Sequence, residues 1–219
     1  MEQALQALRA SMLECRECAA LVKCRSRVVP GDGAVPAKIM FVGIAPGRFG
    51  GDLTGIPFSG DRSGILLRRM LARAHIDDVF ITNLVRCNPR DERGRNRDPH
   101  AGEIGNCRKH LEAEIAIVKP RVIACLGAMA WHHIAGIDLN FKAPFDPTHP
   151  AIQRRDGVIL YPMYHPGYVI RGAYPERRYM RDFLQLRRYL DESRHVDLSQ
   201  CSRDARTQWK SPRNRFAPD

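Results

Sequence analysis

Apolar runs and helical patterns alternate along this chain. Residues 38–44, KIMFVGI, are apolar without alternation, which is typical of a strand buried on both faces. Similar runs predict further strands over residues 79–84, 121–126 and 158–161. Apolar residues at helical spacing predict helices over residues 2–13, 65–74, 103–118, 127–134 and 179–190.

Strands that alternate with helices are typical of an α/β domain. We therefore expect one three-layer α/β/α domain over residues 1–194, built on a mainly parallel, four-stranded sheet. From about His195 the composition becomes polar and charged, and we expect residues 195–219 to form a basic, disordered tail.

Composition adds a strong basic bias. The 219 residues include 35 Lys and Arg against 24 Asp and Glu, a formal net charge of +11. Such a surplus is expected of a protein that meets phosphate backbones or an anionic membrane surface, and the alternative is charge that only favours solubility. The longest apolar run, residues 39–44, is too short to cross a bilayer. The first residues do not resemble a secretory signal, so we expect a cytoplasmic protein.

Three segments that follow predicted strands carry the unusual residues. Residues 43–61 hold six glycines, residues 82–89 read TNLVRCNP, and residues 164–168 read YHPGY. Ligands of open α/β sheets bind beyond the carboxyl ends of the strands, and a glycine-rich loop can bring its backbone close to a ligand. A binding site is therefore expected where these segments meet.

The seven cysteines favour metal or cluster ligation over disulfides in a reducing compartment. Cys15 and Cys18 form a CxxC pair, which two distant single cysteines can complete to four thiolates. Zinc and a 4Fe-4S cluster both accept four thiolates, and unliganded thiols are the alternative. The distant pair is Cys87 and Cys107, with Cys24 a weaker candidate ligand, Cys125 a core residue and Cys201 free in the tail.

Together these blocks resemble the iron-sulfur uracil-DNA glycosylases, in the family 4 and family 5 branches. The match covers about residues 13–190 and rests on the CxxC with two distal cysteines and on the runs GIAPG, TGIPFSGD, ITN, VRC, NPR, NRDPH, VIACLGAMA and MYHPGY. The resemblance implies a uracil-DNA glycosylase-like domain with a 4Fe-4S cluster held by Cys15, Cys18, Cys87 and Cys107.

One departure leaves the branch open. Members of family 4 have a run similar to GEAPG at the start of the loop that corresponds to residues 43–61. This chain has Ile44 in place of the acidic residue. Ile44 and the run Ser59-Gly60-Asp61 resemble family 5, but residues 165–178 are more similar to family 4. The range of damaged bases is open for the same reason.

Hydrolysis of an N-glycosidic bond in DNA requires the base to be flipped out of the stack. Phe58 could stack on that base, and the Asn83 amide could accept from uracil N3–H and donate to O4. His165 could donate to O2 as this oxygen gains negative charge. The alternative interpretations are that Phe58 is a core aromatic, that Asn83 only ends a strand, and that His165 is structural. Backbone contacts to the base edge are expected at Gly43, Ile44 and Ala45.

Asp61 is the candidate carboxylate for the reaction. As the bond breaks the sugar becomes cationic, and a nearby carboxylate can stabilise the cation and orient water. The competing interpretation is that Asp61 caps the helix predicted near Ile65.

Several arginines are candidate phosphate contacts, and their number suggests DNA binding that is independent of sequence. They are Arg48, Arg171, Arg177 and Arg178, together with Arg86 and the stretch 90–97.

We expect a monomeric enzyme of base excision repair that removes uracil from single- or double-stranded DNA and leaves an abasic site. It is expected to be monofunctional because the three loops contain no lysine to form a Schiff base. The alternatives are a glycosylase for hypoxanthine or another deaminated or alkylated base, and a non-catalytic iron-sulfur DNA-binding protein.

Overall fold

The computed structural model describes residues 1–139, 145–147, 152–153 and 157–192. Its sheet has six strands in the order β1-β3-β2-β4-β6-β5. Four strands run parallel to one another: β2 (Ile39–Gly43), β3 (Val79–Asn83), β4 (Val122–Leu126) and β6 (Ile159–Met163). At one edge β1 (Asp32–Gly33) pairs antiparallel with β3, and at the other edge β5 (Ile152–Gln153) pairs antiparallel with β6. The four predicted strands are confirmed, and the two short edge strands had no signal in the sequence.

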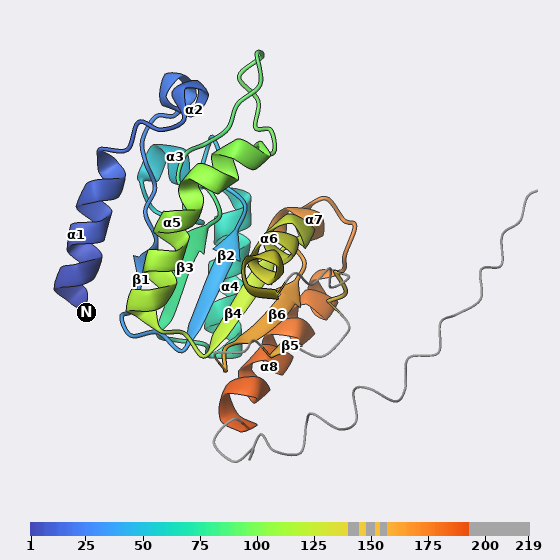
Figure 1. Cartoon of the computed structure of the whole chain (residues 1–219). Coiled ribbons are helices and arrows are strands. Elements are labelled where there is room, and N and C mark those ends of the chain that lie inside the picture. Colours follow the sequence, from blue (N-terminus) through green and yellow to red (C-terminus); the bar gives the residue numbers. More distant parts are fainter. Residues whose placement is uncertain (140–144, 148–151, 154–156, 193–219) are drawn as a thin grey trace, which may run out of the picture.

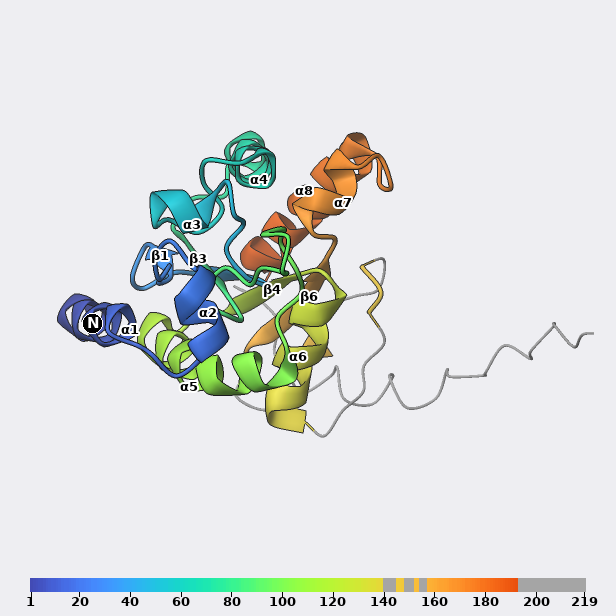
Figure 2. The ribbon, with the colours of Figure 1, turned by 90° about the horizontal axis from the view of Figure 1, so that it is seen from above.

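Helices cover both faces of the sheet, as Figure 1 and the view from above in Figure 2 show. One face carries α5 (Ala101–Val118) and α6 (Ala128–Leu139), with α1 (Glu2–Leu13) beside α5. The other face carries α4 (Arg62–Ala74), α7 (Pro166–Ile170) and α8 (Glu176–Glu192). Two short helices, α2 (Ala19–Cys24) and α3 (Gly51–Thr54), lie toward the carboxyl ends of the strands. The predicted three-layer α/β/α architecture is confirmed.

The strands are buried on both sides, which explains their unbroken apolar runs. In β2, Met40 and Val42 pack into the core beneath α5 and α6. Ile39 and Phe41 pack into the separate core beneath α4 and α8. All four side chains are fully buried, so neither face of β2 has a polar position.

A charged pair is buried between the sheet and α5. The Glu114 carboxylate accepts from the Gly31 amide at 2.8 Å and from the Thr82 hydroxyl at 2.7 Å, and it pairs with Arg86 at 2.5 Å. Glu114 is 0% exposed and Arg86 1% exposed. The expectation that Arg86 contacts phosphate is therefore wrong, because its guanidinium neutralises an internal carboxylate.

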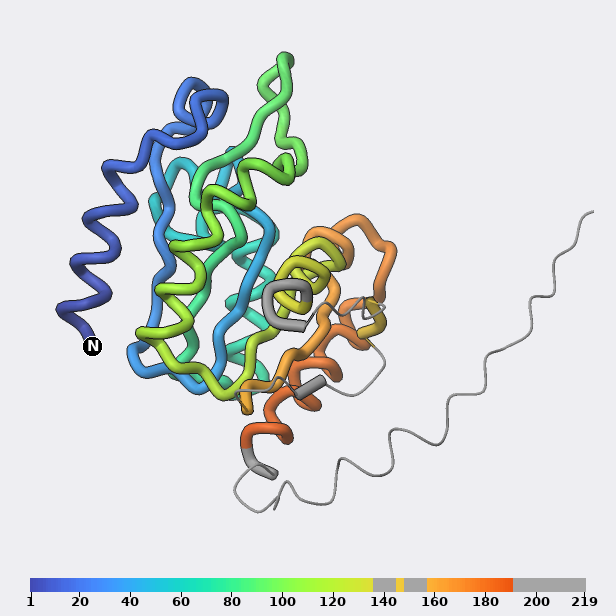
Figure 3. The backbone as a smooth tube through the Cα atoms, viewed as in Figure 1, coloured from blue at the N-terminus to red at the C-terminus, as the bar shows by residue number. Residues whose placement is uncertain are grey.

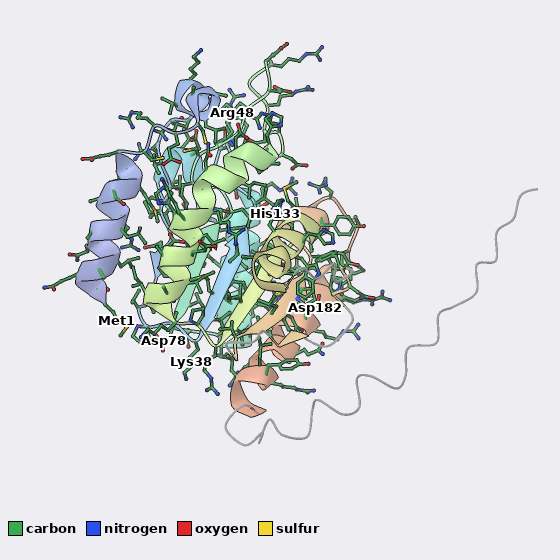
Figure 4. The ribbon with its side chains drawn as sticks, viewed as in Figure 1. Met1, Lys38, Arg48, Asp78, His133 and Asp182 are labelled. Atoms are coloured by element: carbon green, nitrogen blue, oxygen red, sulfur yellow. The ribbon has the colours of Figure 1, made fainter. Side chains whose placement is uncertain are left out.

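Parallel strands place all four carboxyl ends at one edge of the sheet. Figure 4 labels Arg48 near this edge, and Lys38 and Asp78 at the opposite one. Beyond β3, residues 88–98 form a hairpin closed by an Arg90–Asn96 bridge, which rises above the start of α5 in Figure 3. Within the described residues, no helix is both long and apolar enough to cross a bilayer. The predicted tail, residues 195–219, lies outside the described residues.

Candidate active site

A cleft of about 370 Å³ opens at the carboxyl edge of the sheet. Its volume is in the range of small-molecule sites. The loops after β2, β3 and β6 contribute the walls, as expected from the three unusual segments. Among the predicted residues the cleft brings together Ile44, Ala45, Phe58, Asp61, Asn83, Arg97, His165 and Arg171.

Gly43, at the end of β2, allows two of these side chains to meet. A Cβ atom there would lie 2.5 Å from Asn83 Oδ1 and 2.6 Å from the Phe58 ring. Any side chain at position 43 would therefore displace both groups. Phe58 itself has a φ of 49°, which is strained for a bulky residue. Its ring lies 5.6 Å from the His165 ring, half-buried and at the cleft wall.

Asn83 lines the cleft and carries an unusual polar atom. The residue is 1% exposed, and its side-chain Oδ1 is buried without a hydrogen-bond partner. A buried acceptor without a hydrogen bond destabilises the folded protein. A ligand that donates to such an acceptor therefore gains more binding free energy than a ligand that must first displace an existing donor.

His165 is held as a neutral imidazole. Its Nδ1 accepts from the Gly167 amide at 3.0 Å, which caps α7. Burial, reinforced by the Arg171 guanidinium, lowers the pKa of His165 to about 4. Since Nδ1 accepts and the ring is neutral at pH 7, the proton must lie on Nε2. Nε2 is therefore available as a donor.

Asp61 caps α4, so the competing interpretation of this residue describes its position correctly. Its Oδ1 accepts from the Gly64 amide at 2.8 Å. Its Oδ2 lies toward Gly47 and Gly50, where an added Cβ would come within 2.7 and 2.4 Å of that oxygen. Asp61 also lines the cleft, so capping occupies one oxygen and leaves the carboxylate at the wall.

Two asparagines were missed by sequence reasoning. Asn88 Nδ2 donates to the Pro46 carbonyl at 2.7 Å and to Asn96 Oδ1 at 2.9 Å, and Asn96 Oδ1 also accepts from the Arg48 amide. These bonds fasten the 88–98 hairpin to the first loop, and both asparagines line the cleft. The Asn88-Pro89 step after β3 was the available signal.

Three of the four hairpin arginines form ion pairs within the protein, whereas Arg93 is exposed and is held through its backbone amide, which donates to Asp91. Arg90 pairs with buried Asp52, Arg95 with Asp91 at 2.8 Å, and Arg97 with Glu103 at 2.6 Å. Arg48 donates to the Gly94 carbonyl at 2.7 Å. By contrast, the remaining candidates for phosphate contact are exposed on α7 and α8 or next to them: Arg171, Arg177 and Arg178.

The four predicted ligand cysteines come from the segment between α1 and α2, the loop after β3, and α5. Burial raises the pKa of the Cys87 thiol to about 11 and also raises the pKa of Cys107, and repulsion from the Cys15 thiol adds to both shifts. All four are free thiols. Their mutual influence shows that the chain brings these thiols into one neighbourhood.

Three of these sulfurs already receive N–H donors. Arg25 donates to Cys87 Sγ at 3.1 Å, the Arg86 amide to Cys107 Sγ at 3.4 Å, and Asn106 to Cys18 Sγ at 3.4 Å. Donors of this kind stabilise thiolate ligands of clusters. Cys24 differs, because its thiol donates to the carbonyls of Leu21 and Asn88. Over the described ranges, no three His, Cys, Asp or Glu side chains are arranged to hold a single metal ion.

Comparison with known proteins identifies this arrangement. A family profile described as "Uracil DNA glycosylase superfamily" matches residues 30–187, which include the whole cleft. The chain belongs to the uracil-DNA glycosylase superfamily. The sequence resemblance to this family is thereby confirmed.

Curated relatives within the superfamily carry two type names. The Type-4 uracil-DNA glycosylase of Archaeoglobus fulgidus is 34% identical over 188 residues, covering 80% of this chain and 87% of the relative. That of Sulfurisphaera tokodaii is 32% identical over 190 residues, covering 84% and 83%. The Type-5 uracil-DNA glycosylase of Pyrobaculum aerophilum is 32% identical over 185 residues, covering 71% and 79%. This similarity to both types agrees with the sequence motifs, which resemble family 5 in the loop 43–61 and family 4 in residues 165–178.

The state of His165 leads to a pH prediction. We expect long-range 1H–15N spectra to show a protonated Nε2 and a bare Nδ1 at pH 7, with titration near pH 4. The unfolded chain binds the proton near pH 6.5, so acidification between these values favours unfolding and stability is lost over that interval. The His165→Gln variant assigns the signals. A midpoint near 6.5, or a proton on Nδ1, would contradict this assignment.

Proposed function

We propose that this enzyme hydrolyses the N-glycosidic bond of uracil in DNA and leaves an abasic site. The observation that carries the proposal is the buried, unpartnered Oδ1 of Asn83 in a cleft that also presents a neutral imidazole. An amide acceptor and an imidazole donor match the N3–H and the O2 of uracil.

Recognition of the base follows from this donor and acceptor pattern. Asn83 Oδ1 accepts from uracil N3–H, and the amide nitrogen donates to O4. Cytosine presents an acceptor at N3 and a donor at N4, so it leaves both amide groups mismatched in a dry site. Phe58 supplies a face on which the flipped base replaces its lost stacking.

Departure of the base separates charge. His165 donates from Nε2 to uracil O2 as that oxygen becomes negative, and its low pKa keeps it a neutral hydrogen-bond donor that retains its proton. The Asp61 carboxylate, which also lines the cleft, stabilises the cationic sugar and orients the attacking water. Backbone at Ile44 and Ala45 contacts the base edge, which is consistent with an apolar side chain at position 44.

DNA is held around the flipped nucleotide by phosphate contacts from three exposed arginines: Arg171, which lines the cleft, and Arg177 and Arg178 in the first turn of α8. We propose that the enzyme acts as a monomer.

Cys15, Cys18, Cys87 and Cys107 would hold a 4Fe-4S cluster, and these ligands would join α2, the loop after β3 and α5. The N–H donors to three of the sulfurs support this assignment.

The first test replaces Asn83 by Leu. Because Oδ1 has no partner, the variant should melt no lower than wild type, while uracil release falls about 10²–10³-fold. Release is measured on a labelled strand with one uracil, and hypoxanthine is tested in parallel. The matched control is Asn88→Leu, equally buried but hydrogen-bonded, which should lower the melting temperature. A wild type with full iron content that releases no uracil would refute the proposed function.

Asp61→Asn separates charge from capping. Asparagine caps helices as well as aspartate, so the melting temperature should stay within about 2 °C, while base release falls about 10²-fold. Asp61→Ala, which also removes the cap, should be less stable by about 1 kcal/mol. If Asp61→Asn kept full activity, Asp61 would only be a cap.

Cys107→Ser tests the cluster. Protein purified without oxygen should lose its iron, its acid-labile sulfide and its visible absorbance. Cys24→Ser should keep all three, because a serine hydroxyl can still donate to the two carbonyls that the thiol contacts. A colourless wild type that contains zinc would exclude the 4Fe-4S assignment.

A further inference from the structure

Arg86 lies directly beneath the residue proposed to read the base. Its guanidinium contacts the main-chain carbonyl of Asn83 through Nη1, and the same Nη1 lies 3.3 Å from the Leu84 carbonyl. Nη2 pairs with Glu114 at 2.5 Å, in a site with 1% exposure. The side chain therefore joins a fully buried carboxylate to the end of β3.

The segment after β3 is held from both sides. The Leu84 and Val85 amides donate to the carbonyls of Gly43 and Ile44 at 2.9 and 3.0 Å, which extends the pairing with β2. On the other side, the Arg86 guanidinium donates to the carbonyls of Asn83 and Leu84. Because its amides and carbonyls are both engaged, the backbone of this stretch is held in place, and so is the direction in which the side chain of Asn83 leaves it.

The backbone of Arg86 is also part of the cysteine neighbourhood. Its amide donates to Cys107 Sγ at 3.4 Å, its carbonyl accepts from the Val29 amide at 2.8 Å, and Cys87 follows it in the chain. One residue thus contacts the proposed cluster ligands with its main chain and the proposed base reader with its side chain.

We propose that Arg86 is a positioning residue that fixes the Asn83 amide in the cleft and connects it to the cysteine site. The inference rests on the proposed function. A planar guanidinium can bridge one carboxylate and two carbonyls at once, whereas a lysine ammonium is a point charge without that geometry. Conservation of charge alone should therefore not preserve the position of Asn83.

The test compares Arg86→Lys with Arg9→Lys, a matched control in which the arginine clamps the Gly31 carbonyl at 2.8 and 3.1 Å and does not touch β3. We expect Arg86→Lys to release uracil 10–100-fold more slowly, while keeping its iron and binding DNA with a stable abasic analogue within twofold of wild type. Arg9→Lys should match wild type in all three.

A double variant gives the sharper result. If Arg86 acts through Asn83, then Arg86→Lys/Asn83→Leu should be no slower than Asn83→Leu alone. The inference would be overturned if the losses in uracil-release rate of the two single variants multiplied in the double variant. It would also be overturned if Arg86→Lys released uracil within twofold of the wild-type rate, or if its affinity for abasic DNA fell as much as its rate. If Arg86→Lys does not fold, Arg86→Met/Glu114→Gln replaces it, because no unpaired buried charge remains.

A readout independent of activity separates this inference from the proposed function. The Asn83 side-chain amide resonances should shift in Arg86→Lys and stay in place in Arg9→Lys. A wild type without glycosylase activity would refute the function only, whereas unchanged Asn83 resonances in Arg86→Lys would refute the positioning role.

Discussion

Full burial of the Glu114 carboxylate is the condition on which much of this fold depends. A charge removed from water must be neutralised and its lone pairs must be satisfied, and here three partners come from two distant parts of the chain, Gly31 and the segment 82–86. Gly31 shows how narrow the site is, since a Cβ there would lie 2.7 Å from the carboxylate and 2.3 Å from the Phe80 ring. Position 31 must be glycine, and positions 82 and 86 need donors.

Two side chains that we propose to be functional also have structural roles. His165 caps α7 with one ring nitrogen, and Asp61 caps α4 with one carboxylate oxygen. Capping restricts the rotamers of both residues, so the atoms proposed to act on the substrate are oriented before DNA binds. Such preorganisation reduces the ordering that binding would otherwise require.

The sequence was sufficient for the architecture because each central strand is an unbroken apolar run and the unusual loops follow strands. The same logic gathered Phe58, Asn83 and His165, which the structure finds at one cleft. It failed where partners are distant in the chain. Arg86 looked like surface charge because nothing local marks Glu114, 28 residues away, as its partner. The four-residue α3 and five-residue α7 are too short for helical spacing to reveal.

The internal pairing of the 88–98 hairpin changes how the charge of this protein should be counted. Its four arginines are accompanied by three acids in the hairpin sequence, and two of the arginines pair with Asp52 and Glu103 from outside it. The hairpin therefore brings no surplus of positive charge to DNA despite its arginine content. Each phosphate neutralised by a protein lowers the slope of log K against log salt by about 0.9. The ionic-strength dependence of binding should reflect α7 and α8 and be far shallower than a net charge of +11 suggests.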